Sequence, residues 1–190
     1  MLKLLFPHEY VGSVFDIDYK KVFDMGYRGI LFDIDNTLVP HGSDSTEKVD
    51  DLLRRIQSMG FKILLLSNNS EERIVRFLAN IDALYIHDAQ KPDLANYLKA
   101  IEMLQVRKEE ALCIGDQVFT DIYGANKCGI DNILVAYIRA ADETKIGIRR
   151  NLEKIVLKFY KMNASYQNRI GDIHAKEYAK DVAEQKQAFL

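Results

Sequence analysis

Short apolar segments rich in β-branched and aromatic residues recur along the middle of the chain, separated by helical patterns. The segments are 29–32, 61–67, 83–86, 111–115 and 132–138. Apolar residues at helical spacing recur around 49–56, 74–81 and 94–104. Continuous apolar runs of this length are typical of parallel strands that are buried on both faces. The pattern therefore predicts an α/β fold with a Rossmann-like parallel sheet flanked by helices.

Length and charge limit what such a chain can be. A chain of 190 residues suits one α/β domain and is too short for two. The formal net charge of −2 is too small to draw the whole protein to nucleic acid or to a membrane, so we expect no nucleic-acid partner. Membrane attraction would have to come from a local patch.

The two cysteines and the first residues indicate the compartment. Cys113 and Cys128 form neither a CxxC metal pair nor a disulfide framework, so we expect a reducing, cytoplasmic environment. The apolar run "MLKLLF" ends at Pro7 and is too short for a signal peptide. We expect a soluble protein, with peripheral attachment to the inner face of the membrane as the alternative.

The chain is expected to divide into three parts. Residues 1–28 form an N-terminal segment that packs on the core, residues 29–162 form the domain, and residues 163–190 form a polar tail.

The motif FDID occurs twice, at 15–18 and at 32–35, and its neighbours distinguish the copies. The first copy follows "EYVGSV", which does not indicate a strand, and precedes a short helical pattern, so Asp16 or Asp18 suits a helix N-cap. The second copy follows a predicted strand, which would send the carboxylates of Asp33 and Asp35 to one side at the strand's carboxyl end. Asp33 and Asp35 are therefore the functional candidates.

Further polar residues follow the other predicted strands: Ser67, Asn68, Lys91, Asp116 and, five residues later, Asp121. Functional residues of open parallel sheets gather just beyond the carboxyl ends of the strands. Carboxylates gathered there without a His or Cys ligand favour a hard cation, and Mg²⁺ is the expected ion. A hard cation beside a lysine and a helix N-terminus indicates a phosphate site.

The order DxDxT…S…K…GDxxxxD, spread over residues 29–136, resembles that of the haloacid dehalogenase-like (HAD) phosphatase superfamily. The resemblance implies Mg²⁺-dependent hydrolysis of a phosphomonoester through an aspartyl-phosphate, with Asp33 as nucleophile and Asp35 as general acid–base. It implies a metal held by Asp33, the backbone carbonyl of Asp35, and Asp116. The remaining roles implied are a charge-offsetting Lys91, an orienting Asp121 outside the metal shell, and substrate-side contacts from Thr37, Ser67 and Asn68.

The spacing of the motifs leaves no room for a cap domain. Asp35 to Ser67 admits one loop and one helix, and Ser67 to Lys91 admits one helix and a short strand. An uncovered site admits large substrates. The segments "LLFPHEYVGSVFDIDYKK", "GDQVFTDIYGAN" and "RRNLEKIVLK" further resemble the YqeG-type branch of capless HAD phosphatases, which is related to phosphatidylglycerophosphate phosphatases. That resemblance implies phosphatidylglycerophosphate as substrate and phosphatidylglycerol as product.

Several alternatives stay open. The basic amphipathic pattern of 145–161 is compatible with a helix that covers the sheet or with one that contacts an anionic phospholipid surface. Arg139 is expected to be a surface arginine, with binding of a second substrate phosphate as the alternative. His41 is a candidate for the site mouth, and His87 is expected at a strand end without a ligand role. The competing functions are a soluble phosphatase for small phosphomonoesters or nucleic-acid ends, and a receiver-like module that binds phospho-aspartate without hydrolysis. The oligomeric state is left open.

Overall fold

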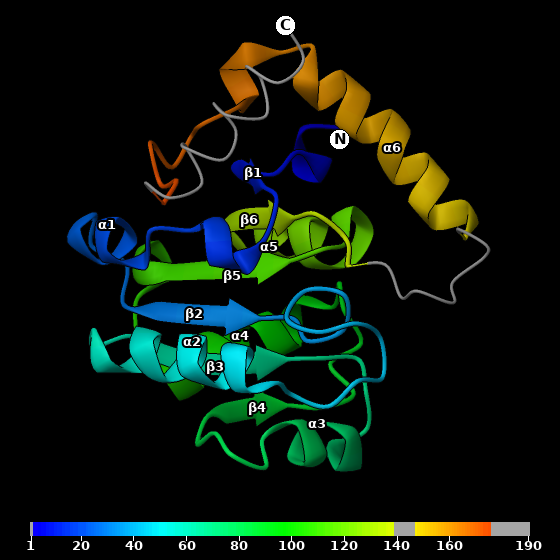
Figure 1. The fold of residues 1–190 in the computed structure, drawn as a ribbon. Helices are drawn as coiled ribbons and strands as arrows, with labels where there is room; N and C mark the ends of the chain where they lie inside the picture. Colours follow the sequence, from blue (N-terminus) through cyan, green and yellow to red (C-terminus); the bar gives the residue numbers. More distant parts are fainter. Residues whose placement is uncertain (1, 139–146, 176–190) are drawn as a thin grey trace, which may run out of the picture.

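A computed structural model describes residues 2–138 and 147–175 of the chain. Its centre is a six-stranded, all-parallel sheet with the strand order β1-β6-β5-β2-β3-β4 (Figure 1). The strands are β1 (Glu9–Val11), β2 (Gly29–Phe32), β3 (Lys62–Leu66), β4 (Leu84–Ile86), β5 (Ala111–Gly115) and β6 (Asp131–Val135). The predicted α/β class and parallel sheet are confirmed.

Helices cover both faces of this sheet. They are α1 (Tyr19–Asp24), α2 (Glu47–Ser58), α3 (Glu71–Phe77), α4 (Leu94–Leu104), α5 (Tyr123–Cys128) and α6 (Ile148–Lys161). Short helical turns complete the described residues: η1 (Leu2–Leu5), η2 (Val14–Asp16), η3 (Lys108–Glu110), η4 (Val118–Ile122) and η5 (Ala164–Tyr166), of which η4 is π-helical.

The alternation of side chains along β2 explains the layers. Ile30 and Phe32 pack in one apolar cluster with Leu53 and Ile56 of α2, whereas Leu31 packs in another cluster with residues of α4 and α5. Successive side chains of a strand point to opposite faces, so a strand that is apolar at every position requires a helical layer on each side. The layers leave the carboxyl ends of the strands free to carry polar groups.

The connections between the central strands are short. The chain from β2 to β3 contains α2, and the chain from β3 to β4 contains α3. No additional domain is inserted in either connection, both of which lie wholly within the described residues. The expected absence of a cap agrees with this architecture.

The N-terminal segment differs from its sequence interpretation, which gave "EYVGSV" no strand. Glu9–Val11 forms β1, which pairs in parallel with β6 at the edge of the sheet. A three-residue strand is too short to show a period in the sequence, so only the pairing with β6 reveals it. The N-cap prediction is confirmed for Asp18, whose carboxylate accepts a hydrogen bond of 3.1 Å from the backbone N–H of Lys21.

Part of the polar C-terminal segment packs against the N-terminal one. Ile173 is fully buried, and its carbonyl accepts a hydrogen bond of 2.7 Å from the backbone N–H of Asp18. An antiparallel bridge joins Ile17 to His174. The polar composition of the segment gave no indication of this docking, in which Ile170 also packs against the core.

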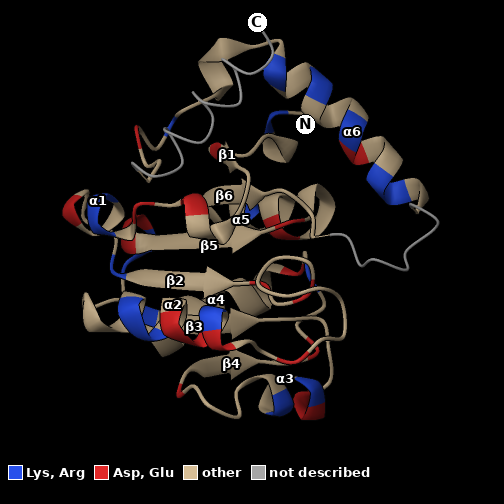
Figure 2. Cartoon of the chain, viewed as in Figure 1, with Lys and Arg blue, Asp and Glu red and all other residues tan. Residues whose placement is uncertain are grey.

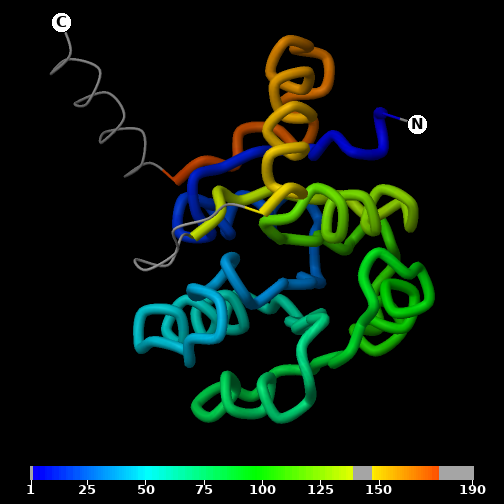
Figure 3. The backbone as a smooth tube through the Cα atoms, turned by 90° about the vertical axis from the view of Figure 1, so that its right-hand side faces the viewer, coloured from blue at the N-terminus to red at the C-terminus, as the bar shows by residue number. Residues whose placement is uncertain are grey.

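Helix α6 lies at the periphery, on the side of the sheet where β1 and β6 lie, and projects from the body of the molecule (Figures 1 and 3). Val156 and Tyr160 attach it to an apolar cluster that includes Phe6 and Ile122. Its charged side chains are mostly basic (Figure 2). Within the described residues, none of the helices combines the length and the apolar character needed to cross a bilayer.

Candidate active site

The predicted site residues follow the ends of the strands. Asp33 follows β2, Ser67 follows β3 and Asp116 follows β5, while Lys91 lies in the loop after β4. Because the strands are parallel and adjacent, their carboxyl ends place these residues at one edge of the sheet. All four side chains belong to buried residues, although polar groups are usually left in water.

Lys91 joins two of the acidic residues. Its ammonium nitrogen lies 2.6 Å from Oδ1 of Asp33 and 2.6 Å from Oδ1 of Asp121. The other carboxylate oxygen of Asp121 accepts a hydrogen bond of 3.0 Å from the backbone N–H of Gln117. One buried cation is therefore shared by two buried carboxylates.

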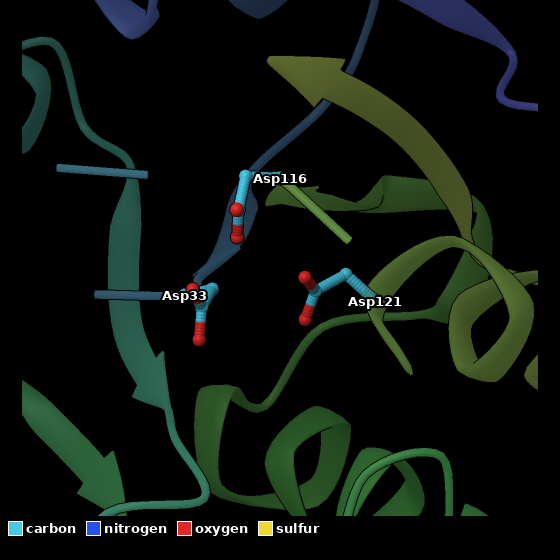
Figure 4. A group of neighbouring side chains, drawn as sticks. All are labelled: Asp33, Asp116 and Asp121. Atoms are coloured by element: carbon cyan, nitrogen blue, oxygen red, sulfur yellow. The ribbon is translucent and has the colours of Figure 1, made fainter. Parts of the chain in front are cut away.

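The carboxylates of Asp33, Asp116 and Asp121 form a single group (Figure 4). One oxygen from each lies within 4.8 Å of the corresponding oxygens of the other two. The hydroxyl of Thr37 lies 3.1 Å from Oδ2 of Asp33 and 3.3 Å from Oδ1 of Asp116, so it links the first two residues. Thr37 thus contacts the carboxylates, with 1% of its surface exposed.

Local packing fixes the position of Asp121. It belongs to the π-helical turn η4, whose carbonyls at Thr120 and Asp121 lie 3.0 Å and 3.4 Å from the hydroxyl of Tyr97. A Cβ atom placed on Gly115 would lie 2.4 Å from Cγ of Asp121. Only glycine at this position lets the carboxylate approach the end of β5 so closely.

The residue Arg150 joins the site from α6, and sequence reasoning did not identify it. Its guanidinium forms an ion pair with Oδ2 of Asp116 and donates a hydrogen bond of 2.8 Å to the backbone carbonyl of the same residue. It also lies 3.0 Å from Glu153, whose other carboxylate oxygen accepts from the backbone N–H of Val118. The sequence showed a basic helix here but not which cation turns inward.

The side chain of Asp35 lies outside this group. Its Oδ1 lies 2.9 Å from the guanidinium of Arg73, and its Oδ2 lies 3.0 Å from the amide nitrogen of Asn69 and 2.9 Å from Nδ1 of His41. His41 is exposed, so it does face the surface beside this acid. The sequence did not indicate the contact between Arg73 and Asp35 either, because Arg73 lies on a separate element, α3.

The polar residues after β3 hold the surrounding loops. The hydroxyl oxygen of Ser67 accepts hydrogen bonds from the backbone and the side-chain amide of Asn69, at 3.2 Å and 3.0 Å. The side chain of Asn68 accepts from the backbone N–H of Lys91 at 2.7 Å. Asn68 therefore positions the loop that carries Lys91. The side chain of His87 contacts its neighbour Asp88, and Arg139 lies outside the described residues.

Burial and mutual repulsion raise the pKa values of two carboxyl groups in the site. Burial raises the pKa of Asp33 to about 6, although Lys91 acts in the opposite direction. Burial, together with the charges of Asp33 and Asp121, raises the pKa of Asp116 to about 8 against the influence of Arg150. Burial alone would lower the pKa of Lys91, but Asp121 and Asp33 outweigh it and raise the pKa above its ordinary value.

The donor set suits a hard divalent cation. Three buried carboxylates converge without a histidine or a thiol among them, and oxygen ligands of this kind favour Mg²⁺ over softer metals. Added positive charge would also relieve the repulsion that raises the pKa of Asp33 and of Asp116. The residues present therefore fit a magnesium site.

Comparisons with known proteins agree with this chemistry. A family model for haloacid dehalogenase-like hydrolases matches residues 40–129. The chain is 31% identical over 169 residues to "Probable phosphatase YqeG" of Bacillus subtilis (strain 168). The match covers 88% of this chain and 98% of that protein. It is 27% identical over 97 residues to a glyceraldehyde 3-phosphate phosphatase of Pyrococcus abyssi, which covers 45% of this chain and 40% of that protein.

Among solved structures, an uncharacterized protein from Listeria monocytogenes serotype 4b matches with a TM-score of 0.50 and 20% sequence identity. The match covers 70% of this chain and 99% of that one. At this identity the similarity concerns the fold.

Proposed function

The chain belongs to the haloacid dehalogenase-like hydrolase family, and from that premise we propose that it hydrolyses phosphomonoesters with Mg²⁺ through an aspartyl-phosphate on Asp33. The observation that supports this most directly is the buried group of Asp33, Asp116 and Asp121 with Lys91 between two of its members. A carboxylate held beside a fixed ammonium group and able to share a divalent cation suits attack on an anionic phosphoryl group.

In the first half-reaction a carboxylate oxygen of Asp33 forms a bond to phosphorus while the bond from phosphorus to the leaving oxygen breaks. Asp35 gives its proton to that oxygen, so the product leaves as an alcohol. Lys91 neutralises part of the charge that accumulates between nucleophile and phosphate. Ser67 and Asn68 follow β3 at the same edge and are proposed to donate to the phosphoryl oxygens.

In the second half-reaction Asp35 removes a proton from water, whose oxygen bonds to phosphorus. The bond between phosphorus and Asp33 breaks, and inorganic phosphate and the free carboxylate result. Asp35 is proposed as the proton carrier on the family resemblance; its side chain is 12% exposed and is held by Arg73, Asn69 and His41. These contacts keep its carboxyl group near the rim, outside the buried group.

Magnesium would be held by Asp33 and Asp116, with the backbone carbonyl of Asp35 as the further protein ligand. When bound, the ion supplies positive charge that draws the phosphoryl oxygens toward the nucleophile. Asp121, which already contacts Lys91 and the backbone of Gln117, is proposed to orient Lys91. Thr37 keeps the carboxylates of Asp33 and Asp116 at a fixed separation.

We propose phosphatidylglycerophosphate as the substrate. The support is the match to the YqeG protein along most of both chains, and the short connections around β3, which leave the site without an inserted cap. A site without a cap admits a head group that remains attached to a large body. The alternative is a small soluble phosphomonoester, which the name of the Pyrococcus relative favours.

The first experiment measures phosphate release from p-nitrophenyl phosphate with Mg²⁺ and with EDTA. Magnesium-dependent release is expected, and a protein that binds but does not hydrolyse would fail this test. The second compares phosphatidylglycerophosphate in vesicles with soluble phosphomonoesters such as glyceraldehyde 3-phosphate. If the lipid is turned over no faster, the phosphatase assignment stands and the lipid substrate is wrong.

A further inference from the structure

The two faces of α6 have different surroundings. Val156 and Tyr160 are buried against the core, and Glu153 is buried beside them. On another face of the helix a row of large apolar side chains is exposed, with exposed fractions between 48% and 80%: Ile148, Leu152, Ile155 and Phe159, followed by Met162 directly after the helix with 73%. The row thus faces away from the protein core.

The spacing makes these residues a continuous stripe. Their separations of four, three, four and three residues keep them on one side of an α-helix, which advances 3.6 residues per turn. The stripe is about 20 Å long at a rise of about 1.5 Å per residue. Apolar residues exposed singly are normal on a protein surface, but a contiguous stripe marks a contact surface.

Cations accompany the stripe. Lys154, Lys158 and Lys161 are exposed at helical spacing along one flank, and Arg149 is exposed near the first turn. The one acidic residue of α6, Glu153, is turned inward and bonded to Arg150 and to the backbone of Val118. The outward surface of the helix is therefore apolar and basic, because its one carboxylate is buried.

We propose that this exposed face of α6 docks on a bilayer surface that contains anionic lipids. The stripe would enter the boundary between head groups and acyl chains, and the lysines would contact the anionic head groups. A second copy of the chain fits less well, because a two-fold contact along the stripe would bring the two rows of lysines together. Docking does not depend on the proposed activity or on its substrate.

The flank of α6 that carries the lysines also lies beside residues of the candidate active site. A cavity of about 160 Å³ is lined by Asp116, Arg150, Lys154, Leu157 and Tyr10, among others. A second cavity, of about 430 Å³, shares the last three of these and adds Lys158 and Lys161. Docking along α6 would therefore bring anionic head groups to lysines that line cavities beside Arg150 and Asp116.

The test is co-sedimentation of the full chain with vesicles in EDTA, so that catalysis plays no part. One set of vesicles is purely phosphatidylcholine, and the other contains phosphatidylglycerol as well. We expect binding to the anionic vesicles that weakens as salt is added. The double variant Ile155→Ser/Phe159→Ser should lose most of this binding, and Lys154→Gln/Lys158→Gln should weaken it about tenfold or more.

Matched controls place equal changes on other helices. Val75→Ser/Leu98→Ser removes apolar side chains that are 52% and 45% exposed, and Lys99→Gln/Lys108→Gln removes two exposed lysines. Both should bind as the parent does, and Asp33→Asn should bind normally while lacking turnover. Equal binding to both vesicle types, equal losses in the control variants, or no binding at all would each overturn the proposal. So would a dimer, measured by light scattering, that the Ile155/Phe159 variant dissociates.

Discussion

The ammonium nitrogen of Lys91 lies 2.6 Å from a carboxylate oxygen of Asp33, and both residues are more than nine-tenths buried. The two residues come from loops after different strands, β4 and β2, that are separated in the sheet by β3. A buried charge is stable only when it is paired and hydrogen-bonded, so this contact fixes the position of Asp33. Replacement of Asp33 is therefore the most direct test of the proposed chemistry.

Replacement of Asp33 by Asn should abolish phosphatase turnover while the fold survives. The amide cannot form the aspartyl-phosphate, and Lys91 retains its contact with Asp121. We expect at least a 10³-fold loss of kcat with p-nitrophenyl phosphate, since the covalent step would be lost altogether. Circular dichroism should report an unchanged fold. Undiminished turnover would refute the role of Asp33.

The matched control lies in the other FDID copy. Asp18→Asn alters the N-cap of α1, and asparagine caps helices about as well as aspartate. Turnover should be unchanged and the melting temperature should shift only slightly. A large loss of turnover in this variant would show that the first copy takes part in the chemistry after all.

Replacement of Gly115 by Ala should displace Asp121. The added Cβ would lie 2.4 Å from Cγ of Asp121, which Lys91 and the backbone of Gln117 hold in place. Overpacking of this kind costs about 1–3 kcal/mol of stability, and the shift of Asp121 should lower kcat at least tenfold. Thermal melts and steady-state kinetics measure the two effects. Gly147→Ala, where no atom lies within 4 Å of the new Cβ, should leave kcat unchanged.

Replacement of Arg150 by Gln should destabilise the metal-free protein. Asp116 and Glu153 would lose their shared cation, and breaking a buried ion pair costs about 3 kcal/mol. Magnesium should then raise the melting temperature more in the variant than in the parent, because no guanidinium competes for Asp116. Melts in EDTA and in Mg²⁺ test this, with the exposed neighbour Arg149→Gln as control. Equal magnesium shifts in both proteins would show that Arg150 does not affect the metal site.

The stability of the region around the N-terminal strand should decrease at acid pH, because the carboxylate of Asp131 becomes protonated there. Hydrogen bonds from His8 and from Tyr27, each 2.6 Å long, lower the pKa of its carboxyl group below the ordinary value. A depressed pKa gives stability that is present above about pH 4, the value in an unfolded chain, and is lost as the pH falls through the folded value. Asp131→Asn should therefore melt lower than the parent at pH 7.

The difference between parent and Asp131→Asn should shrink as the pH falls below about 4, where the parent carboxyl also becomes neutral. Melts from pH 3 to pH 7 measure it. The control is Asp51→Asn, which removes an exposed carboxylate paired with Arg54 and should have little effect at any pH. A difference that stays constant across the range would mean that packing, rather than charge, makes Asp131 important.

The parallel sheet, and the placement of Asp33, Lys91 and Asp116 at one edge of it, could be predicted without coordinates. Buried parallel strands are apolar at every position, and their carboxyl ends share one edge, so residues after each strand must meet there. The helix cap at Asp18 could also be predicted, because capping depends only on neighbours in the chain. In each case local pattern and sheet topology are sufficient.

Only the tertiary structure decided which partners these residues have. Arg150 reaches Asp116 across 34 positions and Arg73 reaches Asp35 across 38, and neither pairing follows from a local pattern. The strand β1 forms because its backbone pairs with β6 at the edge of the sheet. The apolar stripe of α6 is exposed because the helix packs on the core through Val156 and Tyr160 instead. A sequence specifies which side chains a helix can present, but packing against the rest of the chain selects the face that is buried.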